Sequence, residues 1–301
     1  MNRPNNAATI PRVRVARGQL TRTIGPWHLV RQLGEGQLTE VYQARPTSST
    51  REETADYVVK VLKRSCQDDP LAIQLLQREA FVARQVRHPH LSSILSARTD
   101  SAPRFVVMPY IDGVSVADAL QEVGRFIVPQ ALWIVRQTGE ALRALHQHGW
   151  RHGDVKPANI IVSANGHATL ADLGLARPLD ASRSSEDALT GSMAYACPET
   201  FNPNVPFSPV SDVYSLGITL YELLTASRPF TDQDPTDLAA AHLTRPAPDP
   251  RLTVPQLPPR VSRLLRQMLA KDPLRRPAVP ELIDWFVDLE VETFSERRSV
   301  S

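Results

Sequence analysis

HGDVKPANI, at residues 152–160, brings a histidine, an aspartate, a lysine and an asparagine into one short segment. Asp154 can orient an attacking hydroxyl or accept a proton from it, and Lys156 can neutralise a group that is being transferred. Asn159 offers a neutral amide oxygen, a ligand type that hard cations accept. Together the three side chains indicate chemistry on a negatively charged group.

A second acidic position follows in ATLADLGLA, residues 168–176. Asp172 comes after a short apolar strand and before a turn that contains a glycine. Two carboxylates and an amide on adjacent loops suit Mg²⁺, which prefers oxygen ligands and usually also binds substrate phosphates. Each residue taken alone fits an ordinary turn, since Asp and Asn are frequent there. Their order and spacing together favour a metal site.

Two features upstream fit the same chemistry. LGEGQLTEV, residues 33–41, lies between two predicted strands, and Gly34 and Gly36 let the backbone approach a ligand without a Cβ clash. Taken alone, a glycine-containing hairpin is the simpler interpretation. The segment gains weight from Lys60, which alternates with buried positions in DYVVKVLKR and needs a partner, because burying an unpaired ammonium is costly. Glu79, in the middle of the next predicted helix, is the expected partner.

Periodicity divides the chain into a strand-rich first part and a helix-rich remainder. The expected strands before residue 110 are WHLVRQLGEG, TEVYQAR, DYVVKVLKR, LSSILSAR and RFVVMPY, and the expected helix is PLAIQLLQREAFVARQVRHP. Beyond residue 110 amphipathic helices dominate, and VSDVYSLGITLYELLTA is apolar nearly all round, which predicts a buried helix. A cleft is expected near residue 110, where the two parts meet.

The composition excludes several classes of protein. The chain has 301 residues, of which 22% are charged, and a formal net charge of +2. Extensive disorder is therefore not expected, and neither is a nucleic-acid partner. No apolar run approaches the roughly 18 residues of a membrane span, and the first residues lack the apolar core of a secretory signal. With Cys66 and Cys197 as its two cysteines, the chain has no disulfide framework, and a cytoplasmic location is expected.

In these segments and their order the chain resembles a eukaryotic-type serine/threonine protein kinase of the bacterial kind, over about residues 25–290. LGEGQLTEV is similar to the family's glycine-rich loop, YVVK to V-A-I-K, HGDVKPAN to H-R-D-L-K-x-x-N, DLG to D-F-G and CPE to A-P-E. The resemblance implies an α+β, bilobal fold with a five-stranded antiparallel sheet and one helix in the N-lobe and a mostly helical C-lobe. The expected division is a flexible basic tail (1–22), a kinase domain (23–292, with the N-lobe at about 23–109 and the C-lobe at about 113–292) and a C-terminal tail (293–301).

The resemblance also implies a role for each matching residue. Lys60 would hold the α- and β-phosphates of ATP and pair with Glu79. Asp172 and Asn159 would hold Mg²⁺, or Mn²⁺ in its place. Asp154 would position the substrate hydroxyl and act as the base, while the transfer itself depends mainly on positioning and charge stabilisation.

The nucleotide is expected between the glycine-rich loop and the hinge that joins the lobes. The residues expected around it are Leu33, Gly34, Gly36, Val41, Val58, Lys60, Met108, Pro109, Ile111 and Ile161, with Met108 as the gatekeeper. Pro109 stands where the family usually has glutamate, but it keeps the backbone carbonyl that would accept a hydrogen bond from adenine. Val58 replaces a smaller alanine and predicts a tighter pocket, and Leu173 replaces the Phe of D-F-G but stays apolar.

Other matches concern the acceptor. Lys156, two places after Asp154, is the pattern of serine/threonine kinases and is counted among the catalytic residues. GSMAYACPE, residues 191–199, resembles the family's peptide-binding segment, with Ser192 where threonine is usual. Protein substrates with serine or threonine acceptors are therefore expected, and autophosphorylation with them. The alternatives are a pseudokinase that acts as a nucleotide-binding or scaffolding module, and a phosphotransferase for small molecules.

Some matches imply structural roles. Asp212 is expected to anchor the catalytic loop. Glu199 and Arg276 are similar to a buried ion pair of the family. The oligomeric state does not follow from the sequence.

Gly153 departs from the family pattern, which has arginine at this position. In kinases that are regulated by loop phosphorylation, this arginine helps to hold the phosphate. We therefore hypothesise activity that does not require a phosphorylated loop, although Ser182, Ser184, Ser185 and Thr190 remain candidate autophosphorylation sites.

Overall fold

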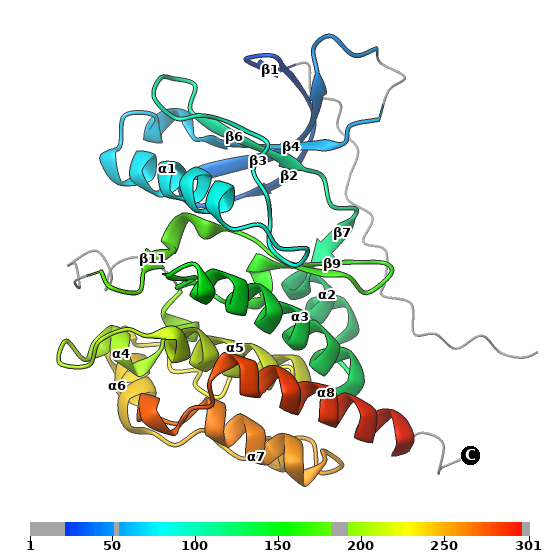
Figure 1. The fold of residues 1–301 in the computed structure, drawn as a ribbon, viewed down its shortest axis with the longest axis vertical. Coiled ribbons are helices and arrows are strands. Elements are labelled where there is room, and N and C mark those ends of the chain that lie inside the picture. The colour runs from blue at the N-terminus through cyan, green and yellow to red at the C-terminus, as the bar shows by residue number, and fades with distance from the viewer. Residues whose placement is uncertain (1–21, 51–53, 182–191, 297–301) are drawn as a thin grey trace, which may run out of the picture.

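A computed structural model of the chain describes residues 22–50, 54–181 and 192–296, with side chains to residue 294. The strands of the first part lie above a body of helices (Figure 1), and the expected α+β bilobal arrangement is confirmed. Ser182, Ser184, Ser185 and Thr190 lie outside the described residues, as does nearly all of the expected basic tail. No helix among the described residues is long and apolar enough to cross a membrane.

The N-lobe sheet is antiparallel and has the order β1-β2-β3-β4-β6-β5. Its strands are β1 (Thr23–Ile24), β2 (Trp27–Glu35), β3 (Thr39–Pro46), β4 (Tyr57–Leu62), β5 (Ser96–Arg98) and β6 (Phe105–Pro109). The prediction of five strands is therefore wrong by one. The additional strand, β1, pairs Thr23 with His28 and Ile24 with Trp27 across a tight turn, and two residues are too short to show an alternating pattern.

Helix α1 (Pro70–Gln85) is the single long helix of the N-lobe among the described residues. It begins at the expected proline, and the Asp69 side chain caps it by accepting hydrogen bonds from the backbone N–H groups of Leu71 (2.8 Å) and Ala72 (3.1 Å). Its inward face is apolar with one exception, Glu79, which is buried. An acidic side chain on the apolar face of a helix needs a charged partner.

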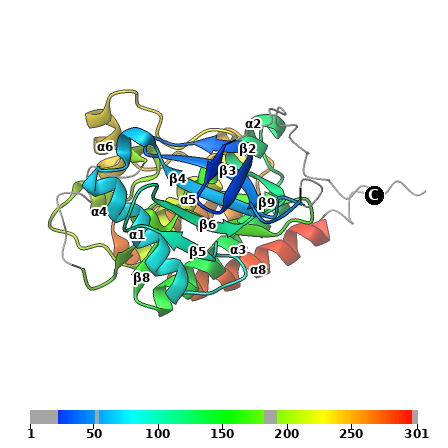
Figure 2. The same cartoon turned by 90° about the horizontal axis from the view of Figure 1, so that it is seen from above.

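The C-lobe elements are β7 (Gly113–Ser115), α2 (Val116–Val123), α3 (Val128–Gln147), β8 (Trp150–Arg151), β9 (Ile160–Ser163), β10 (Ala168–Leu170), β11 (Arg177–Pro178), α4 (Pro198–Phe201), α5 (Pro209–Thr225), α6 (Pro235–Thr244), α7 (Pro259–Met268) and α8 (Val279–Glu296). The short strands form two small sheets, β10-β9-β7 and β11-β8. Helix α8, seen from above in Figure 2 along α3, continues to Glu296 and so extends past residue 292, where the domain was expected to end.

Helix α5 forms the centre of the C-lobe. Nearly every residue from Ser211 to Thr225 is buried, as its apolar sequence predicts. Its N-terminal turn presents Asp212, which is 1% exposed, toward the loop between β8 and β9. A buried acidic side chain of α5 thus contacts the backbone of the HGDVKPAN segment.

Candidate active site

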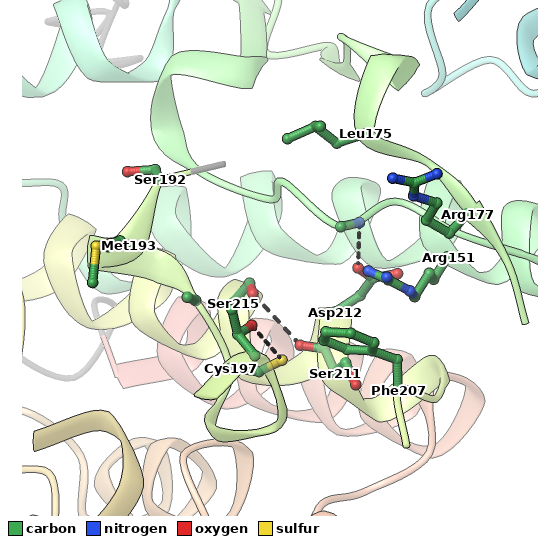
Figure 3. A pocket seen from close by; sticks show the side chains of 13 residues that line it. Arg151, Leu175, Arg177, Ser192, Met193, Cys197, Phe207, Ser211, Asp212 and Ser215 are labelled. Atoms are coloured by element: carbon green, nitrogen blue, oxygen red, sulfur yellow. Dashed lines mark hydrogen bonds between the residues drawn. The ribbon is translucent and has the colours of Figure 1, made fainter. Parts of the chain in front are cut away.

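Asp212 on α5 fixes the loop that follows β8 through hydrogen bonds to its backbone (Figure 3). The backbone N–H groups of His152 and Gly153 donate to its two carboxylate oxygens at 2.8 and 2.9 Å, and His146 Nε2 lies 2.8 Å from Oδ2. Burial by itself raises the pKa of Asp212, but the hydrogen bond and charge of His146 outweigh it and lower the pKa to about 2. The expected anchoring role of Asp212 is present in the structure.

His152 holds the same loop from its other side. The backbone N–H of Asp154 donates to His152 Nδ1 at 3.2 Å, so the ring proton sits on Nε2, which donates to the carbonyl of Ala171 at 3.2 Å. Ala171 directly precedes Asp172. A fully buried imidazole therefore ties the Asp154 loop to the Asp172 loop.

Asp154 is 9% exposed, and its carboxylate is shared by two neighbours on the chain. Lys156 Nζ lies 2.6 Å from Oδ2, and Asn159 Nδ2 donates to the same oxygen at 2.8 Å and to the Asp154 carbonyl at 2.8 Å. The backbone N–H of Ser192 reaches Oδ1 at 3.4 Å. Ser192 therefore contacts the Asp154 carboxylate through its backbone.

Lys60 joins three elements. Its Nζ lies 2.8 Å from Glu79 Oε2 on α1 and 2.9 Å from Asp172 Oδ1, so the expected ion pair with Glu79 is present. Burial lowers the pKa of Lys60, but the charges of Asp172 and Glu79 outweigh this and raise it overall. Burial also raises the pKa of Glu79, although Lys60 opposes it. Lys60 therefore stays cationic at neutral pH.

Asp172 has a left-handed backbone conformation, with φ of 67° and ψ of 76°. This conformation is uncommon outside glycine, and Asp tolerates it better than most residues. Partial burial raises the pKa of Asp172, but Lys60 lowers it to about 2, so the carboxylate is ionised. Its side chain is 45% exposed, which leaves oxygen surface open to a ligand.

The residue after Asp172 fixes the loop in place. Leu173 is fully buried, as its apolar character predicted. Arg78, the neighbour of Glu79 on α1, donates from Nη1 to the carbonyl of Gly174 at 3.3 Å. The sequence did not predict this contact of Arg78. An arginine next to a buried glutamate on a helix gives no indication of a partner 96 residues further along the chain.

The expected nucleotide-binding residues lie where the N-lobe sheet faces the C-lobe. Strand register pairs Val41 with Lys60 and Val58 with Met108, and β9 carries Ile161 opposite Ser115 of β7. The side chains expected to contact adenine are half-buried, apart from Val58, which is buried, and Pro109, which is exposed; the half-buried ones are Leu33, Val41, Met108, Ile111 and Ile161. Partial burial of apolar side chains is typical of a surface that a ligand completes.

The glycine-rich loop has an acidic side chain at its tip. Gly34 and Gly36 are exposed, and the Gly36 N–H donates to the Thr39 carbonyl at 2.8 Å, which closes the turn. Between them, Glu35 Oε1 lies 2.6 Å from Lys63 Nζ. Lys63 thus neutralises the carboxylate at the tip of this loop, a contact that the sequence did not reveal.

Glu199 and Arg276 form a buried, bidentate ion pair. The two Nη atoms of Arg276 lie 2.7 and 2.8 Å from the two carboxylate oxygens, both side chains have 0% exposure, and Ser211 Oγ donates to Oε1 at 2.7 Å. The pair expected from the sequence is therefore present, and it fixes the end of the CPE segment to the turn before α8.

No group of three or more His, Cys, Asp or Glu side chains within the described ranges is arranged to hold a metal ion. The donor set that remains for a cation is small. The amide nitrogen of Asn159 donates to Asp154, so the amide oxygen of Asn159 points away from Asp154. Asp172 offers a partly exposed carboxylate. These two oxygens fit Mg²⁺ only if phosphates and water complete the coordination, which is the usual arrangement for this ion.

The sequence matches the family described as protein kinase domain over residues 27–286. It is 34% identical to the serine/threonine-protein kinases PknD and PknE of Mycobacterium tuberculosis, over 261 and 255 residues. It is 31% identical to the serine/threonine-protein kinase PknA of Mycobacterium bovis over 258 residues. These matches cover 86%, 83% and 84% of this chain. The chain belongs to the protein kinase domain family.

The relatives are longer than this chain. The same matches cover 38%, 43% and 58% of PknD, PknE and PknA. The chain therefore spans less than two thirds of each relative.

Proposed function

We propose that this chain transfers the γ-phosphoryl group of Mg·ATP to serine or threonine hydroxyls of proteins, itself included. The observation that carries the proposal is the joining of two charged clusters: Lys60 with Glu79 and Asp172, and Asp154 with Lys156 and Asn159. His152 connects the two loops that bear them. These are the charged groups that the proposed phosphoryl transfer would need from the protein.

Binding of ATP is assigned to the N-lobe side. Lys60, held by Glu79, would neutralise the α- and β-phosphates, and Gly34 and Gly36 would let backbone N–H groups approach them. Adenine would lie among the half-buried apolar side chains near Met108, with hydrogen bonds from and to the backbone at Pro109 and Ile111. The exposure of Pro109 supports this, since a ligand can reach the hinge at that residue.

Asp172 and Asn159 would hold Mg²⁺, or Mn²⁺ in its place, together with phosphate oxygens. The bound metal would supply charge neutralisation along the phosphate chain. Asp172 is ionised at neutral pH because Lys60 lowers its pKa to about 2. Asn159 is kept in one orientation by its two hydrogen bonds to Asp154.

Asp154 and Lys156 would act on the acceptor. Asp154 would orient the substrate hydroxyl and accept its proton as the O–P bond forms. Lys156 Nζ, 2.6 Å from the Asp154 carboxylate, lies where it can also stabilise the charge on the transferred group. Lys156 at this position and the names of the related serine/threonine-protein kinases support an aliphatic hydroxyl as acceptor.

The peptide-binding segment supports a protein substrate. Its 3₁₀ helix, Met193–Tyr195, is held by Tyr195 Oη, which donates to Glu222 Oε2 at 2.5 Å, and by Ser215 Oγ, which donates to the Tyr195 carbonyl at 2.8 Å. The segment reaches Asp154 through the N–H of Ser192. A rigid platform beside the catalytic aspartate suits an extended peptide better than a small molecule.

The two cysteines support a reducing compartment, and we place the activity in the cytoplasm. Cys66 and Cys197 are both free thiols. Cys197 is buried, and burial raises its pKa to about 11, so it has no tendency to act as a nucleophile at neutral pH.

Transfer of labelled phosphate from ATP in the presence of Mg²⁺, to the protein and to a generic peptide acceptor, tests the proposal. Asp154→Asn and Asp172→Ala should each lower the rate by at least about 10²-fold, while both proteins keep the unfolding temperature of the parent within a few degrees. Label on serine or threonine that disappears in both variants is the expected result. A folded parent protein that binds ATP but transfers no phosphate would support the pseudokinase alternative instead.

A further inference from the structure

Three half-buried histidines lie side by side where the loop after α1 meets the β9–β10 hairpin. His88 and His90 belong to the loop between α1 and β5, and His167 directly precedes β10. The ring centroids of His90 and His167 are 4.5 Å apart, with 32° between the ring planes, and those of His88 and His90 are 5.6 Å apart. We call these three side chains the histidine cluster. None of them belongs to the proposed nucleotide, metal or acceptor site.

The cluster lies at a junction between the two lobes. The Leu170 N–H donates to the His90 carbonyl at 2.9 Å, and the Ser92 N–H donates to the Leu170 carbonyl at 2.9 Å. The loop continues from α1, which carries Glu79, and β10 ends two residues before Asp172. A change at this junction therefore affects two of the charged groups of the candidate active site.

The hydrogen bonds of the cluster fit neutral rings. His88 Nδ1 accepts the backbone N–H of His90 at 3.2 Å, so this nitrogen carries no proton, and protonation would remove the acceptor. His90 Nδ1 lies 2.8 Å from the Ala168 carbonyl and donates to it. His167 Nε2 donates to the Pro89 carbonyl at 3.0 Å. These two bonds persist in the protonated rings, so any effect of charge on His90 and His167 is electrostatic.

The charged side chains around the cluster disfavour further positive charge. Glu140 Oε2 lies 3.5 Å from His90 Nε2, but the other oxygen of this carboxylate already contacts Arg136 Nη1 at 2.5 Å. Arg143, also on α3, acts on His88 as a second cation. Among the described charged residues that act on His88 and His90, one carboxylate thus faces two arginines. A ring that takes up a proton also adds a positive charge beside the other rings.

Burial favours the neutral rings as well. It lowers the pKa of His88 and of His90, and an adjacent histidine of the cluster lowers each pKa further, while Glu140 raises both. The hydrogen bond to the Ala168 carbonyl also raises the pKa of His90 without reversing the shift. A loop released from the junction therefore takes up protons more readily than the bound loop. The junction is at full strength above the ordinary histidine pKa of about 6.5 and weakens as pH falls below it.

We propose that the histidine cluster is a proton-sensitive clamp, which holds the loop after α1 against β10 while its rings are neutral and releases the loop when they gain charge. Because the rings are adjacent, their protonation is coupled, and the second proton meets the charge of the first. Release would loosen the end of α1 and the strand that leads to Asp172 together. The clamp belongs to the fold and does not depend on phosphate transfer, so it can hold even where the proposed function fails.

Amide hydrogen exchange of the full chain without ATP tests the clamp. The N–H groups of Leu170 and Ser92, which bond across the junction, are followed at about pH 7.5 and about pH 5.5, on either side of the ordinary histidine pKa. Each observed rate is divided by the intrinsic exchange rate at the same pH. We expect the protection of both amides to fall about tenfold or more at the lower pH, which is the effect of one pKa shift of about one unit. Amides in the buried centre of α5 should keep their protection.

A triple variant keeps the hydrogen bonds of the cluster but cannot be protonated. His88→Asn and His90→Asn place an amide oxygen and an amide nitrogen where the respective Nδ1 atoms lie, and His167→Gln places an amide nitrogen near the position of Nε2. Together these substitutions should give equal protection at both pH values. His148→Asn is the matched control, because His148 is exposed and its Nδ1 also contacts a backbone carbonyl, that of Ala144, at 2.8 Å. It should lose protection as the parent does.

Glu140→Gln tests the charge balance directly. It removes the carboxylate that favours protonated rings, so the loss of protection should begin at a lower pH than in the parent. A loss that begins at a higher pH would contradict the clamp. The proposal is overturned if the parent shows no loss between the two pH values, a result that needs no variant to fold, or if the triple variant shows the same loss as the parent.

Discussion

Lys60 Nζ lies 2.8 Å from Glu79 Oε2, and through these two buried atoms strand β4 and helix α1 are held in one arrangement. The same ammonium reaches Asp172 at 2.9 Å. One cation therefore sets the position of the helix and of the proposed metal carboxylate together. Because both partners lie within hydrogen-bond distance, removing one leaves the other in contact with Lys60.

Replacement of Lys60 should be far more damaging than replacement of Glu79. Lys60→Met removes the charge proposed for the α- and β-phosphates and should lower kcat/KM for ATP by about 10²-fold or more. Glu79→Gln should cost less, since Asp172 still holds the ammonium. Steady-state kinetics with varied ATP measure both.

Lys63→Met is the matched control for this comparison. Its ammonium contacts Glu35, at the tip of the glycine-rich loop. It should change kcat/KM by no more than a few-fold, because exposed ion pairs contribute little. A Lys60→Met protein with the kinetics of Lys63→Met would contradict the assignment of Lys60.

The Glu199–Arg276 pair should be the most sensitive ion pair for stability. Both side chains are fully buried, so Glu199→Gln or Arg276→Met leaves a charge without its partner. The expected loss is about 3–5 kcal/mol in the free energy of unfolding. Urea denaturation of the full chain measures it.

The exposed pair Arg245–Asp232 provides the comparison. Its atoms are equally close, at 2.8 Å, but Arg245 is half exposed. Arg245→Met should leave the urea midpoint within experimental error of the parent. If Arg276→Met lowered the free energy of unfolding no more than Arg245→Met, burial would not be the reason that the Glu199–Arg276 pair stabilises the fold.

The contacts among the candidate site residues could be predicted from the sequence more fully than the contacts around them, for a physical reason. Asp154, Lys156 and Asn159 lie in one short segment, so their proximity follows from chain connectivity alone. The Lys60–Glu79 pair could also be predicted, because a buried ammonium needs a carboxylate and α1 carries one on its apolar face.

Other features depend on pairings that the sequence does not display. Strand β1 has two residues, too few to show an alternating pattern. The contact of Lys63 with Glu35 joins the residue after β4 to the last residue of β2, which are far apart in the sequence. The pairing of Arg151 with Arg177 depends on the β8–β11 register.

Gly153 should not tolerate a side chain. Its φ is 80°, and an added Cβ would lie 2.9 Å from the Leu175 carbonyl oxygen as well as 3.0 Å from Arg151 Nη1. Gly153→Ala should therefore cost the left-handed backbone penalty of about 1–2 kcal/mol plus the displacement of Leu175, and it should lower kcat because the next residue is Asp154.

Gly124→Ala separates the two costs. Gly124 has a similar φ of 75°, but nothing lies within 4 Å of the added Cβ. Its loss of stability, measured by the same denaturation, should equal the backbone penalty alone, with no change in kcat. Equal effects of the two substitutions on both quantities would show that the Leu175 contact is not restrictive.

His242 is the buried group that should make stability depend on pH. It is fully buried on α6, its Nδ1 lies 3.1 Å from Tyr214 Oη, and its Nε2 has no hydrogen-bond partner among the described residues. Burial lowers its pKa to about 4, aided by the charges of Lys271 and Arg228 and opposed by Asp232. The imidazole is therefore neutral in the folded chain at neutral pH.

The sign of the effect follows from proton binding. The unfolded chain takes up a proton on this histidine below its ordinary pKa of about 6.5, while the folded chain does so only near pH 4. Stability should therefore decrease as pH falls from about 6.5 toward 4, by on the order of 3 kcal/mol from this group, and this contribution should level off below pH 4. His242→Phe removes the group and should reduce the slope of this part of the curve. His148→Gln, which removes an exposed histidine, should keep the slope of the parent. If the stability of the parent did not change between pH 6.5 and 4, the prediction would be wrong, and His242 would take up its proton equally in the folded and unfolded chain.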